Sequence, residues 1–293
     1  MILVRIGAHM SVSGGKYKAF EKARELKCEA LQVFIRNVRG WKSGPLKQKE
    51  IDDFISKKEE FSDTIWPVIS HNSYLVNLAT LDKEKLENSF NAMIDELTKV
   101  DQLKIEYENM HPGVIPIVDK KEITKEEALT QIAEQLNQLI DFTKTSQAVI
   151  LLETTAGQGK GLGNKFHHFK KIIDQIQNKK RIGICFDTAH SFAAGYDFTT
   201  KKKYEEMWNE FDDVIGLKYL FAFHLNDTEK DCGSRVDRHT HIGQGKLGKE
   251  PFRFLVNDER FINLPGILET PKGNDNKLDI MNLKILKNLR KKN

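Results

Sequence analysis

Histidines and carboxylates follow six successive apolar segments of the chain, at or shortly after the point where each segment ends. These five histidines and four carboxylates are His71, His111, Glu153, Asp187, His190, His224, Asp237, His239 and Glu269. Taken singly, a histidine at such a place is more often a hydrogen-bonded structural residue, and an acidic residue is often a helix N-cap. Gathered on one face of the molecule, four carboxylates would need cations to neutralise them.

The types of these residues indicate which metal they would bind and for what purpose. Imidazole nitrogen mixed with carboxylate oxygen, without a thiolate, suits zinc or manganese in a catalytic rather than a structural site. Nine ligands are too many for one tetrahedral ion. They suffice for three ions that keep positions open for water or substrate, so the residues by themselves predict a multinuclear catalytic centre.

The segments that must position these side chains alternate with helical patterns along the whole chain. The eight apolar runs, each expected to form a strand, are Ile2–Ala8, Ala30–Ile35, Ile65–Ile69, Leu103–Tyr107, Ala148–Leu152, Ile182–Phe186, Tyr219–Phe223 and Gly266–Leu268. Eight strand–helix repeats predict an α/β protein built as a single (β/α)8 TIM barrel over residues 1–293, with a doubly wound open sheet as the alternative. In a barrel, the residues at the strand exits would share one face.

Apolar residues at helical spacing mark several of the intervening helices. Thr124-Lys125-Glu126-Glu127 has the spacing of a capping box that opens one of them. The three expected stripes are Leu129, Ile132, Leu136 and Leu139; Leu86, Phe90, Met93, Ile94 and Leu97; and Leu278, Met281, Ile285 and Leu289. His167 and His168, in a charged stretch, are predicted to lie on a helix surface.

The composition is that of a globular protein, with 39% hydrophobic and 30% charged residues among 293. No stretch approaches the roughly 20 apolar residues of a membrane helix, so no membrane partner is expected. The N-terminal residues are predicted to form a strand rather than a signal peptide. Cys28, Cys185 and Cys232 form no CxxC pair and indicate reduced thiols in an intracellular compartment. The net charge of +4 permits nucleic-acid binding without demanding it.

Five longer motifs carry a family resemblance. They are His-Asn-Ser-Tyr-Leu (71–75), Thr-Ala-Gly-Gln-Gly (155–159), Phe-Asp-Thr-Ala-His (186–190), His-Leu-Asn-Asp (224–227) and Gly-Ser-Arg-Val-Asp-Arg-His (233–239). With them, nearly the whole chain resembles the endonuclease IV family of apurinic/apyrimidinic endonucleases. The resemblance implies three zinc ions, with manganese possible in one position. It groups the ligands as His71, His111 and Glu153; Glu153, Asp187, His224 and Glu269; and His190, Asp237 and His239.

The loop after the second apolar run interleaves basic and aromatic residues, and such a loop can contact phosphates and wedge into a base stack. From the residues alone, a solvated loop anchored by one tryptophan is an equal alternative. The resemblance implies that Arg39 and Tyr74 insert into DNA at the lesion. Further DNA-contact candidates are Asn37, Trp41, Leu75, Arg235 and Arg238.

The resemblance also implies the reaction. A zinc-dependent enzyme would cut duplex DNA 5′ to an abasic site, leaving a 3′-hydroxyl and a 5′-deoxyribose phosphate, with 3′-end cleaning as a further activity. Glu269 and Glu153 are the expected catalytic residues, and we expect a monomer that acts wherever the genome is repaired, in cytoplasm, organelle, nucleus or viral particle. A metal-dependent sugar isomerase and a non-catalytic DNA-binding protein are the alternatives.

Overall fold

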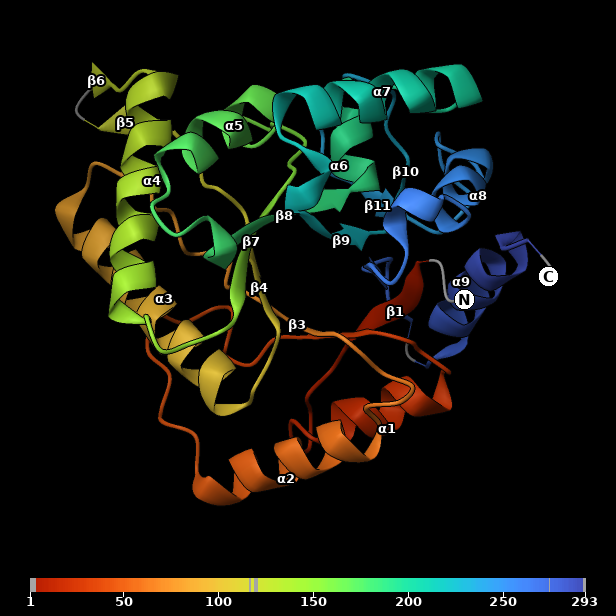
Figure 1. The fold of residues 1–293 in the computed structure, drawn as a ribbon, viewed down its shortest axis with the longest axis horizontal. Coiled ribbons are helices and arrows are strands. Elements are labelled where there is room, and N and C mark those ends of the chain that lie inside the picture. Colours follow the sequence, from red (N-terminus) through yellow and green to blue (C-terminus); the bar gives the residue numbers. More distant parts are fainter. Residues whose placement is uncertain (1–3, 116, 119–120, 274, 292–293) are drawn as a thin grey trace.

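Eight parallel strands close into a barrel, which confirms the predicted fold class (Figure 1). The computed structural model describes residues 4–115, 117–118, 121–273 and 275–291. Around the barrel the strands follow the order β1-β12-β9-β8-β7-β4-β3-β2. They are β1 (Arg5–Met10), β2 (Leu31–Val33), β3 (Val68–His71), β4 (Tyr107–Met110), β7 (Val149–Glu153), β8 (Ile182–Asp187), β9 (Leu220–His224) and β12 (Pro265–Leu268).

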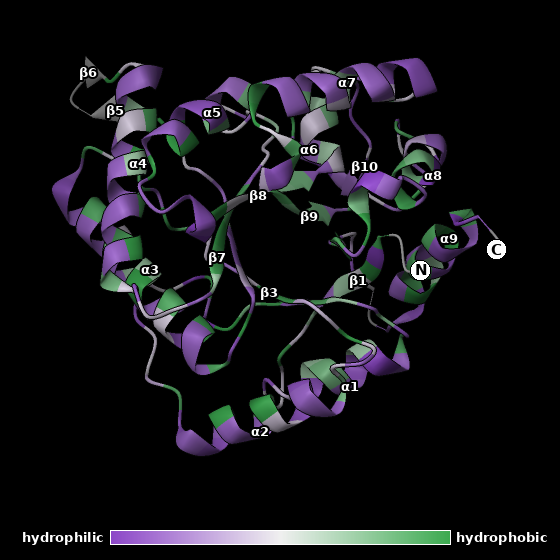
Figure 2. Ribbon diagram, in the orientation of Figure 1, coloured by the Kyte–Doolittle hydropathy of each residue, from purple (hydrophilic) through white to green (hydrophobic). Residues whose placement is uncertain are grey.

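Helices surround the barrel, and their outer faces are mostly hydrophilic (Figure 2). They are α1 (Lys18–Glu25), α2 (Gln48–Glu60), α3 (Lys83–Gln102), α4 (Lys125–Phe142), α5 (Phe166–Gln175), α6 (Thr188–Ala193), α7 (Lys201–Val214), α8 (Glu250–Val256) and α9 (Lys277–Leu289). Two short antiparallel pairs join β5 (Ile117–Val118) to β6 (Lys121–Glu122) and β10 (Asp227–Thr228) to β11 (His239–Thr240). Within the described residues, no helix has the length and apolar character that a membrane crossing requires.

Several strand boundaries differ from the apolar runs. Strand β4 begins at Tyr107, because Leu103 is the C-cap of α3 and packs in the core beneath that helix. Strand β3 begins at Val68 rather than Ile65. Residues 2–3 of the first predicted run lie outside the described residues. An apolar run records burial, whereas a strand is bounded by its ladder of hydrogen bonds, so the two coincide only in part.

The helical predictions also have mixed outcomes. Thr124 caps α4 and accepts a hydrogen bond from the Glu127 amide at 3.2 Å, and the predicted α4 stripe is buried. In α3, Met93 and Leu97 are buried and the rest of the stripe is half-buried. In the predicted α9 stripe Leu289 is buried, whereas Leu278, Met281 and Ile285 are half-buried, with Ile285 packed against the core. The buried face of α9 consists of Asp279, Asn282, Leu283, Leu286 and Leu289.

Two polar residues are buried at positions where the sequence did not predict burial. Asn282 is fully buried on α9, where its side chain accepts from the Ile242 amide at 3.0 Å and donates to Thr270 Oγ1 at 3.0 Å. His168 is buried rather than exposed, and its Nδ1 accepts a hydrogen bond of 3.2 Å from the Gly163 amide. Hydrophobic periodicity cannot identify such positions, because it does not register the hydrogen-bond partners that allow a polar side chain to be buried.

Alternation along the strands places the functional side chains. An apolar layer fills the barrel interior and consists of Ala30, Ile69, Leu151, Cys185, Ala222 and Ile267. Successive side chains of a strand point to opposite faces, so the residue two positions later points inward again. Those later residues are Gln32, His71, Glu153, Asp187, His224 and Glu269. On the two remaining strands, β1 and β4, the equivalent positions hold His9 and Asn109, so a ring of polar residues covers the apolar layer.

Candidate metal centre

The nine residues singled out in the sequence lie together at the carboxyl ends of the strands. Ligand atoms of eight of them form three groups, within each of which the atoms lie no more than 4.8 Å apart. The groups are His71, His111 and Glu153; Glu153, Asp187, His224 and Glu269; and Asp187, His190 and His239. Since Glu153 and Asp187 each belong to two groups, the three form one continuous cluster.

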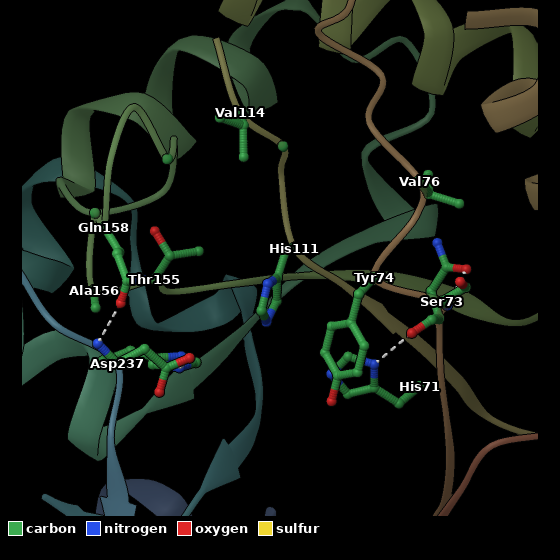
Figure 3. A pocket seen from close by; sticks show the side chains of 15 residues that line it. His71, Ser73, Tyr74, Val76, His111, Val114, Thr155, Ala156, Gln158 and Asp237 are labelled. Carbon is green, nitrogen blue, oxygen red and sulfur yellow. Dashed lines mark hydrogen bonds and ion pairs between the residues drawn. The ribbon is translucent and has the colours of Figure 1, made fainter. Parts of the chain in front are cut away.

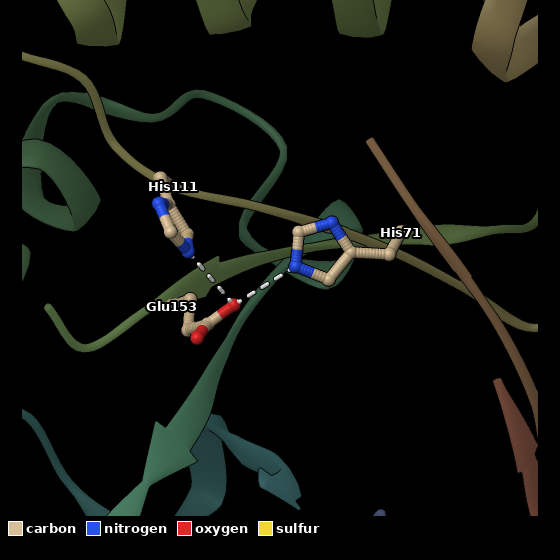
Figure 4. Close-up of side chains that lie close together, drawn as sticks. All are labelled: His71, His111 and Glu153. Carbon is tan, nitrogen blue, oxygen red and sulfur yellow. Dashed lines mark hydrogen bonds and ion pairs between the residues drawn. The ribbon is translucent and has the colours of Figure 1, made fainter. Parts of the chain in front are cut away.

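In the first group, two imidazoles point at one carboxylate oxygen (Figure 4). Glu153 Oε2 lies 3.3 Å from His71 Nε2 and 3.4 Å from His111 Nε2. His71 Nδ1 donates to the Asn72 carbonyl at 2.9 Å, which leaves Nε2 as the nitrogen that faces the site. Asn109 donates a hydrogen bond of 2.6 Å to the same Glu153 oxygen.

The second group centres on His224, which is fully buried. Its Nδ1 lies 3.2 Å from Glu153 Oε1, 3.1 Å from Glu269 Oε2 and 3.8 Å from Asp187 Oδ2. Asn226 ties two of these carboxylate residues together. It donates to Asp187 Oδ2 at 2.7 Å and accepts from the Glu269 amide at 2.8 Å.

The third group differs in one member from the grouping that the family resemblance implied. Asp187 Oδ2 lies 3.8 Å from His239 Nε2 and takes the place of Asp237 in the compact group. Asp237 is nevertheless adjacent, 3.2 Å from His190 Nε2 and 3.4 Å from His239 Nε2. Its side chain is 46% exposed, whereas Asp187 is buried, so Asp237 is the member that solvent reaches.

Backbone and side-chain contacts hold this third group in place. His190 Nδ1 donates to the Thr154 carbonyl at 2.9 Å, so its Nε2 faces His239 Nε2, 3.3 Å away. The amide of Asp237 donates to Gln158 Oε1 at 3.0 Å, a bond drawn as a dashed line in Figure 3. Gln158 therefore fixes the loop that carries Asp237 and His239.

The electrostatics of the cluster call for added positive charge. Burial by itself raises the pKa of Glu153, but His224 and His111 outweigh it and hold that pKa well below its usual value. Burial lowers the pKa of His190, yet Asp187, Asp237 and Glu153 raise it well above the usual range. The carboxylates thus stay ionised and draw positive charge from protonated imidazoles, a charge that bound cations can supply instead.

Two buried atoms test whether the residues fit metal ions. Glu153 Oε1 and His224 Nδ1 are buried and have no hydrogen-bond partner among the described residues, although they lie 3.2 Å apart. Buried polar atoms are nearly always paired, so an unpaired nitrogen and an unpaired oxygen that face one another are suitably placed to bind a cation. With nitrogen and oxygen donors throughout, the cluster fits divalent metal ions of the zinc or manganese type.

A cavity of about 160 Å³ opens beside the first and third groups. His71, His111, His190 and Asp237 line it together with Tyr74 (Figure 3). The Tyr74 side chain is 65% exposed, and its ring centroid lies 5.7 Å from that of His71 and 6.0 Å from that of His111. Partial burial raises the pKa of its phenol to about 12, so the ring presents a neutral face to a ligand.

The other candidate DNA-contact residues lie on the loops after β2, β3 and β10 and differ in their exposure. Asn37, Arg39, Leu75, Arg235 and Arg238 are exposed, and the last two lie on the same loop as Asp237. Trp41 is half-buried against the core, where its ring anchors the loop after β2 rather than extending into solvent. Its carbonyl accepts a hydrogen bond of 2.8 Å from buried Arg36, which further restrains that loop.

Sequence reasoning missed four residues that support the centre, namely Gln32, Asn109, Gln158 and Asn226. Gln32 and Asn109 each come two positions after an inward-facing residue of the apolar runs, the same spacing that places His71 and Glu153. This spacing could have identified Gln32 and Asn109 from the sequence as residues that face the centre. Gln158 and Asn226 lie in loops, where no periodicity marks them.

Comparison with known proteins places the chain in a family. Residues 20–289 match the xylose isomerase-like TIM barrel family model. The chain is 44% identical to a probable endonuclease 4 of Chloroflexus aggregans over 97% of both proteins. It is 42% identical to an apurinic-apyrimidinic endonuclease of Caenorhabditis elegans over 92% of this chain and 66% of that one.

The chain belongs to the endonuclease IV family of apurinic/apyrimidinic endonucleases.

A solved endonuclease IV, that of Thermus thermophilus, agrees with this assignment. It is 30% identical to this chain, superposes with a TM-score of 0.83, and the match covers 97% of this chain and 98% of that one. The resemblance inferred from the five motifs is therefore confirmed. For this endonuclease IV family member, the assignment of ions to ligand groups and the DNA contacts stay predictions.

Proposed function

We propose that this chain is a zinc-dependent DNA repair endonuclease that hydrolyses the phosphodiester bond 5′ to an abasic site. It leaves a 3′-hydroxyl and a 5′-deoxyribose phosphate and also cleans 3′ ends, as part of base excision repair. One barrel domain over residues 1–293 acts as a monomer on duplex DNA within the cell. The observation that carries this proposal is the continuous cluster of three ligand groups beside a cavity capped by Tyr74.

In this proposal the centre holds three zinc ions, one of which manganese can replace. His71, His111 and Glu153 hold the first, and Glu153, Asp187, His224 and Glu269 hold the second. His190, Asp237 and His239 hold the third, with Asp187 close enough to assist. When bound, clustered ions polarise a phosphate, favour ionisation of water and stabilise charge on the leaving oxygen.

The two glutamates have different surroundings and hence different roles. The Glu153 side chain is fully buried and belongs to two ligand groups, so it would serve as a shared ligand at the base of the centre. The Glu269 side chain retains 16% exposure, and its Oε2 is directed toward the site. Glu269 can therefore orient the attacking water as well as bind metal.

The exposed residues proposed to contact DNA, here called the rim, select the lesion. A nucleotide without a base has lost its pairing and stacking, so turning it out of the duplex costs less than for an intact nucleotide. Tyr74 stands over the cavity with a neutral, exposed ring that can stack in the space the base has left. Arg39, Arg235 and Arg238 are exposed cations that can pair with backbone phosphates.

The test is incision of a duplex oligonucleotide that carries one abasic-site analogue. We compare the wild type with Glu269→Gln, each before and after chelation of metal and after zinc add-back. Cutting 5′ to the lesion is expected from the wild type, lost on chelation and restored by zinc. Glu269→Gln is expected to lose at least about 100-fold in kcat, since even outer-shell partners of a metal are worth about 10- to 100-fold.

Glu59→Gln is the matched control. Glu59 is exposed on α2, so this variant should cut like the wild type. If the folded, metal-loaded wild type binds the duplex without cutting it, the proposed enzymatic function is rejected in favour of a non-catalytic DNA-binding protein. A protein that neither binds nor cuts the duplex would redirect the search to sugar substrates.

A further inference from the structure

Gln32 lies on β2 with its side chain completely buried beneath the metal centre. Its Oε1 lies 2.8 Å from His224 Nε2, and its Nε2 lies 2.6 Å from Glu269 Oε1 and 3.1 Å from His9 Nδ1. One amide thus contacts two proposed ligands of the same ion. Neither the sequence motifs nor the family grouping assigns Gln32 a role.

Only one orientation of this amide satisfies its neighbours. The Glu269 carboxylate is ionised and can only accept, so the Gln32 amino group must face it. The second amino hydrogen is then directed to His9 Nδ1. The Gln32 carbonyl oxygen remains for His224, and because a carbonyl can only accept, His224 Nε2 must carry the proton in that bond.

This orientation determines which atoms are left for the metal. With its Nε2 proton held by Gln32, His224 offers Nδ1, which lies 3.1 Å from Glu269 Oε2 and 3.2 Å from Glu153 Oε1. With Oε1 held by Gln32, Glu269 offers Oε2. The two free atoms are the ones that face each other across the second group.

We infer that Gln32 is a positioning residue of the second metal group, which selects Nδ1 of His224 and Oε2 of Glu269 as the ligand atoms. The inference rests on the proposed metal-dependent function and deepens it. Without Gln32, Glu269 Oε1 would lose the donor that β2 supplies, and the His224 ring could turn over. Outer-shell partners of this kind typically contribute about 10- to 100-fold in metal affinity or activity.

The experiment measures zinc release to a chromogenic chelator, without DNA, for the wild type and Gln32→Met. Methionine has a similar length and no hydrogen-bonding amide. We expect one class of bound zinc in Gln32→Met to be released about 10- to 100-fold faster, while the other ions leave at the wild-type rate. On abasic DNA, kcat should fall while KM stays within about twofold, since no rim residue has changed.

Gln175→Met on α5 is the matched control, because the Gln175 side chain donates only to the Lys171 carbonyl among the bonds described for it, and its backbone carbonyl, which accepts from Asn137, is kept. It should release zinc at the wild-type rate. Wild-type release rates and an unchanged kcat in folded Gln32→Met would overturn the inference. Since the release assay uses no DNA, a wild type that holds zinc without cutting DNA would reject the proposed function and leave this result intact.

A second measurement uses the wild type itself and does not depend on how a variant folds. Nitrogen NMR of histidine-labelled, zinc-loaded protein, assigned with His224→Gln, reports which nitrogen of His224 carries the proton. We expect a protonated Nε2 and a zinc-bound Nδ1. A proton on Nδ1 with zinc on Nε2 would overturn the inference.

Discussion

Ser73 Oγ donates a hydrogen bond of 2.7 Å to the carbonyl oxygen of Val38. This bond joins the loop after β3, which carries Tyr74, to the loop after β2, which carries Arg39. The two side chains proposed to enter DNA at the lesion therefore stand on loops that restrain each other. The Ser73 oxygen also accepts from the Leu75 amide at 3.2 Å, which holds the turn around Tyr74.

Replacing Ser73 by alanine should weaken DNA binding more than chemistry. The bond between the loops contributes about 1 kcal/mol, which corresponds to roughly a fivefold change in affinity. We expect Ser73→Ala to raise KM for abasic duplex about fivefold, because the loops must be ordered again on binding, with kcat within about twofold of wild type. Steady-state kinetics measure both. Ser62→Ala is the control, because the Ser62 hydroxyl donates only to a surface carbonyl on α2, and its kinetics should match those of the wild type. A loss in kcat alone for Ser73→Ala would contradict the loop model.

Asp227 on β10 holds the loop between β11 and α8. Its buried carboxylate accepts four backbone hydrogen bonds of 2.8 to 3.0 Å, from the amides of Thr228, Gly243, Gly245 and Leu247. In Asp227→Asn, the side-chain NH2 would face two of these donors. Since an unsatisfied buried group costs about 1–3 kcal/mol, we expect a destabilisation of about 2–4 kcal/mol, measured by urea unfolding.

The same substitution should also affect the metal centre. Residue 228 pairs with His239 across β10 and β11, so a loosened loop displaces one ligand of the third group. We expect the folded variant to retain less zinc than the wild type. The matched control is Asp174→Asn on α5, whose carboxylate pairs with Lys170 at the surface. If both aspartate variants unfold at the same urea concentration, the buried carboxylate does not stabilise the loop as described.

His168 should make the stability of the protein depend on pH. Burial, with the nearby His167, lowers the pKa of His168 from 6.5 to about 4. Above pH 6.5 the ring is neutral in both the folded and the unfolded chain. Between pH 6.5 and 4 the unfolded chain binds a proton that the folded chain does not, so stability falls as the pH falls. One pKa unit corresponds to about 1.4 kcal/mol, so the loss attributable to His168 is on the order of 3 kcal/mol.

His168→Asn removes this titration and keeps an oxygen that can accept from the Gly163 amide. Its free energy of unfolding should decline less steeply than that of the wild type as the pH falls from 7 to 4. Titration of the metal ligands affects both proteins equally and therefore cancels in this comparison. Urea unfolding across this range measures the difference. His167→Asn, exposed on the same helix, keeps the buried His168 ring and should retain most of the wild-type slope, since burial is the larger cause of the lowered His168 pKa. Equal slopes for wild type and His168→Asn would show that His168 is not buried as the neutral ring.

Residue type and period predicted much of this molecule. The barrel, the Thr124 cap and the buried stripe of α4 followed from local patterns, because alternation with period two or 3.6 is imposed by the backbone itself. Prediction failed at Asn282 and His168, where polar residues occupy buried positions. Each is stabilised by a partner that no local pattern reveals.

The sequence by itself determined that the chain alternates strands with helices and that histidines and carboxylates stand where strands end. These features depend on neighbours a few residues apart. The tertiary structure alone decided which atom of each side chain faces the centre. The partners that settle this for Gln32 lie 192 residues away at His224 and 237 residues away at Glu269. Closure of the barrel brings them within hydrogen-bonding distance, and hydrogen bonds at that range are what orient a side chain.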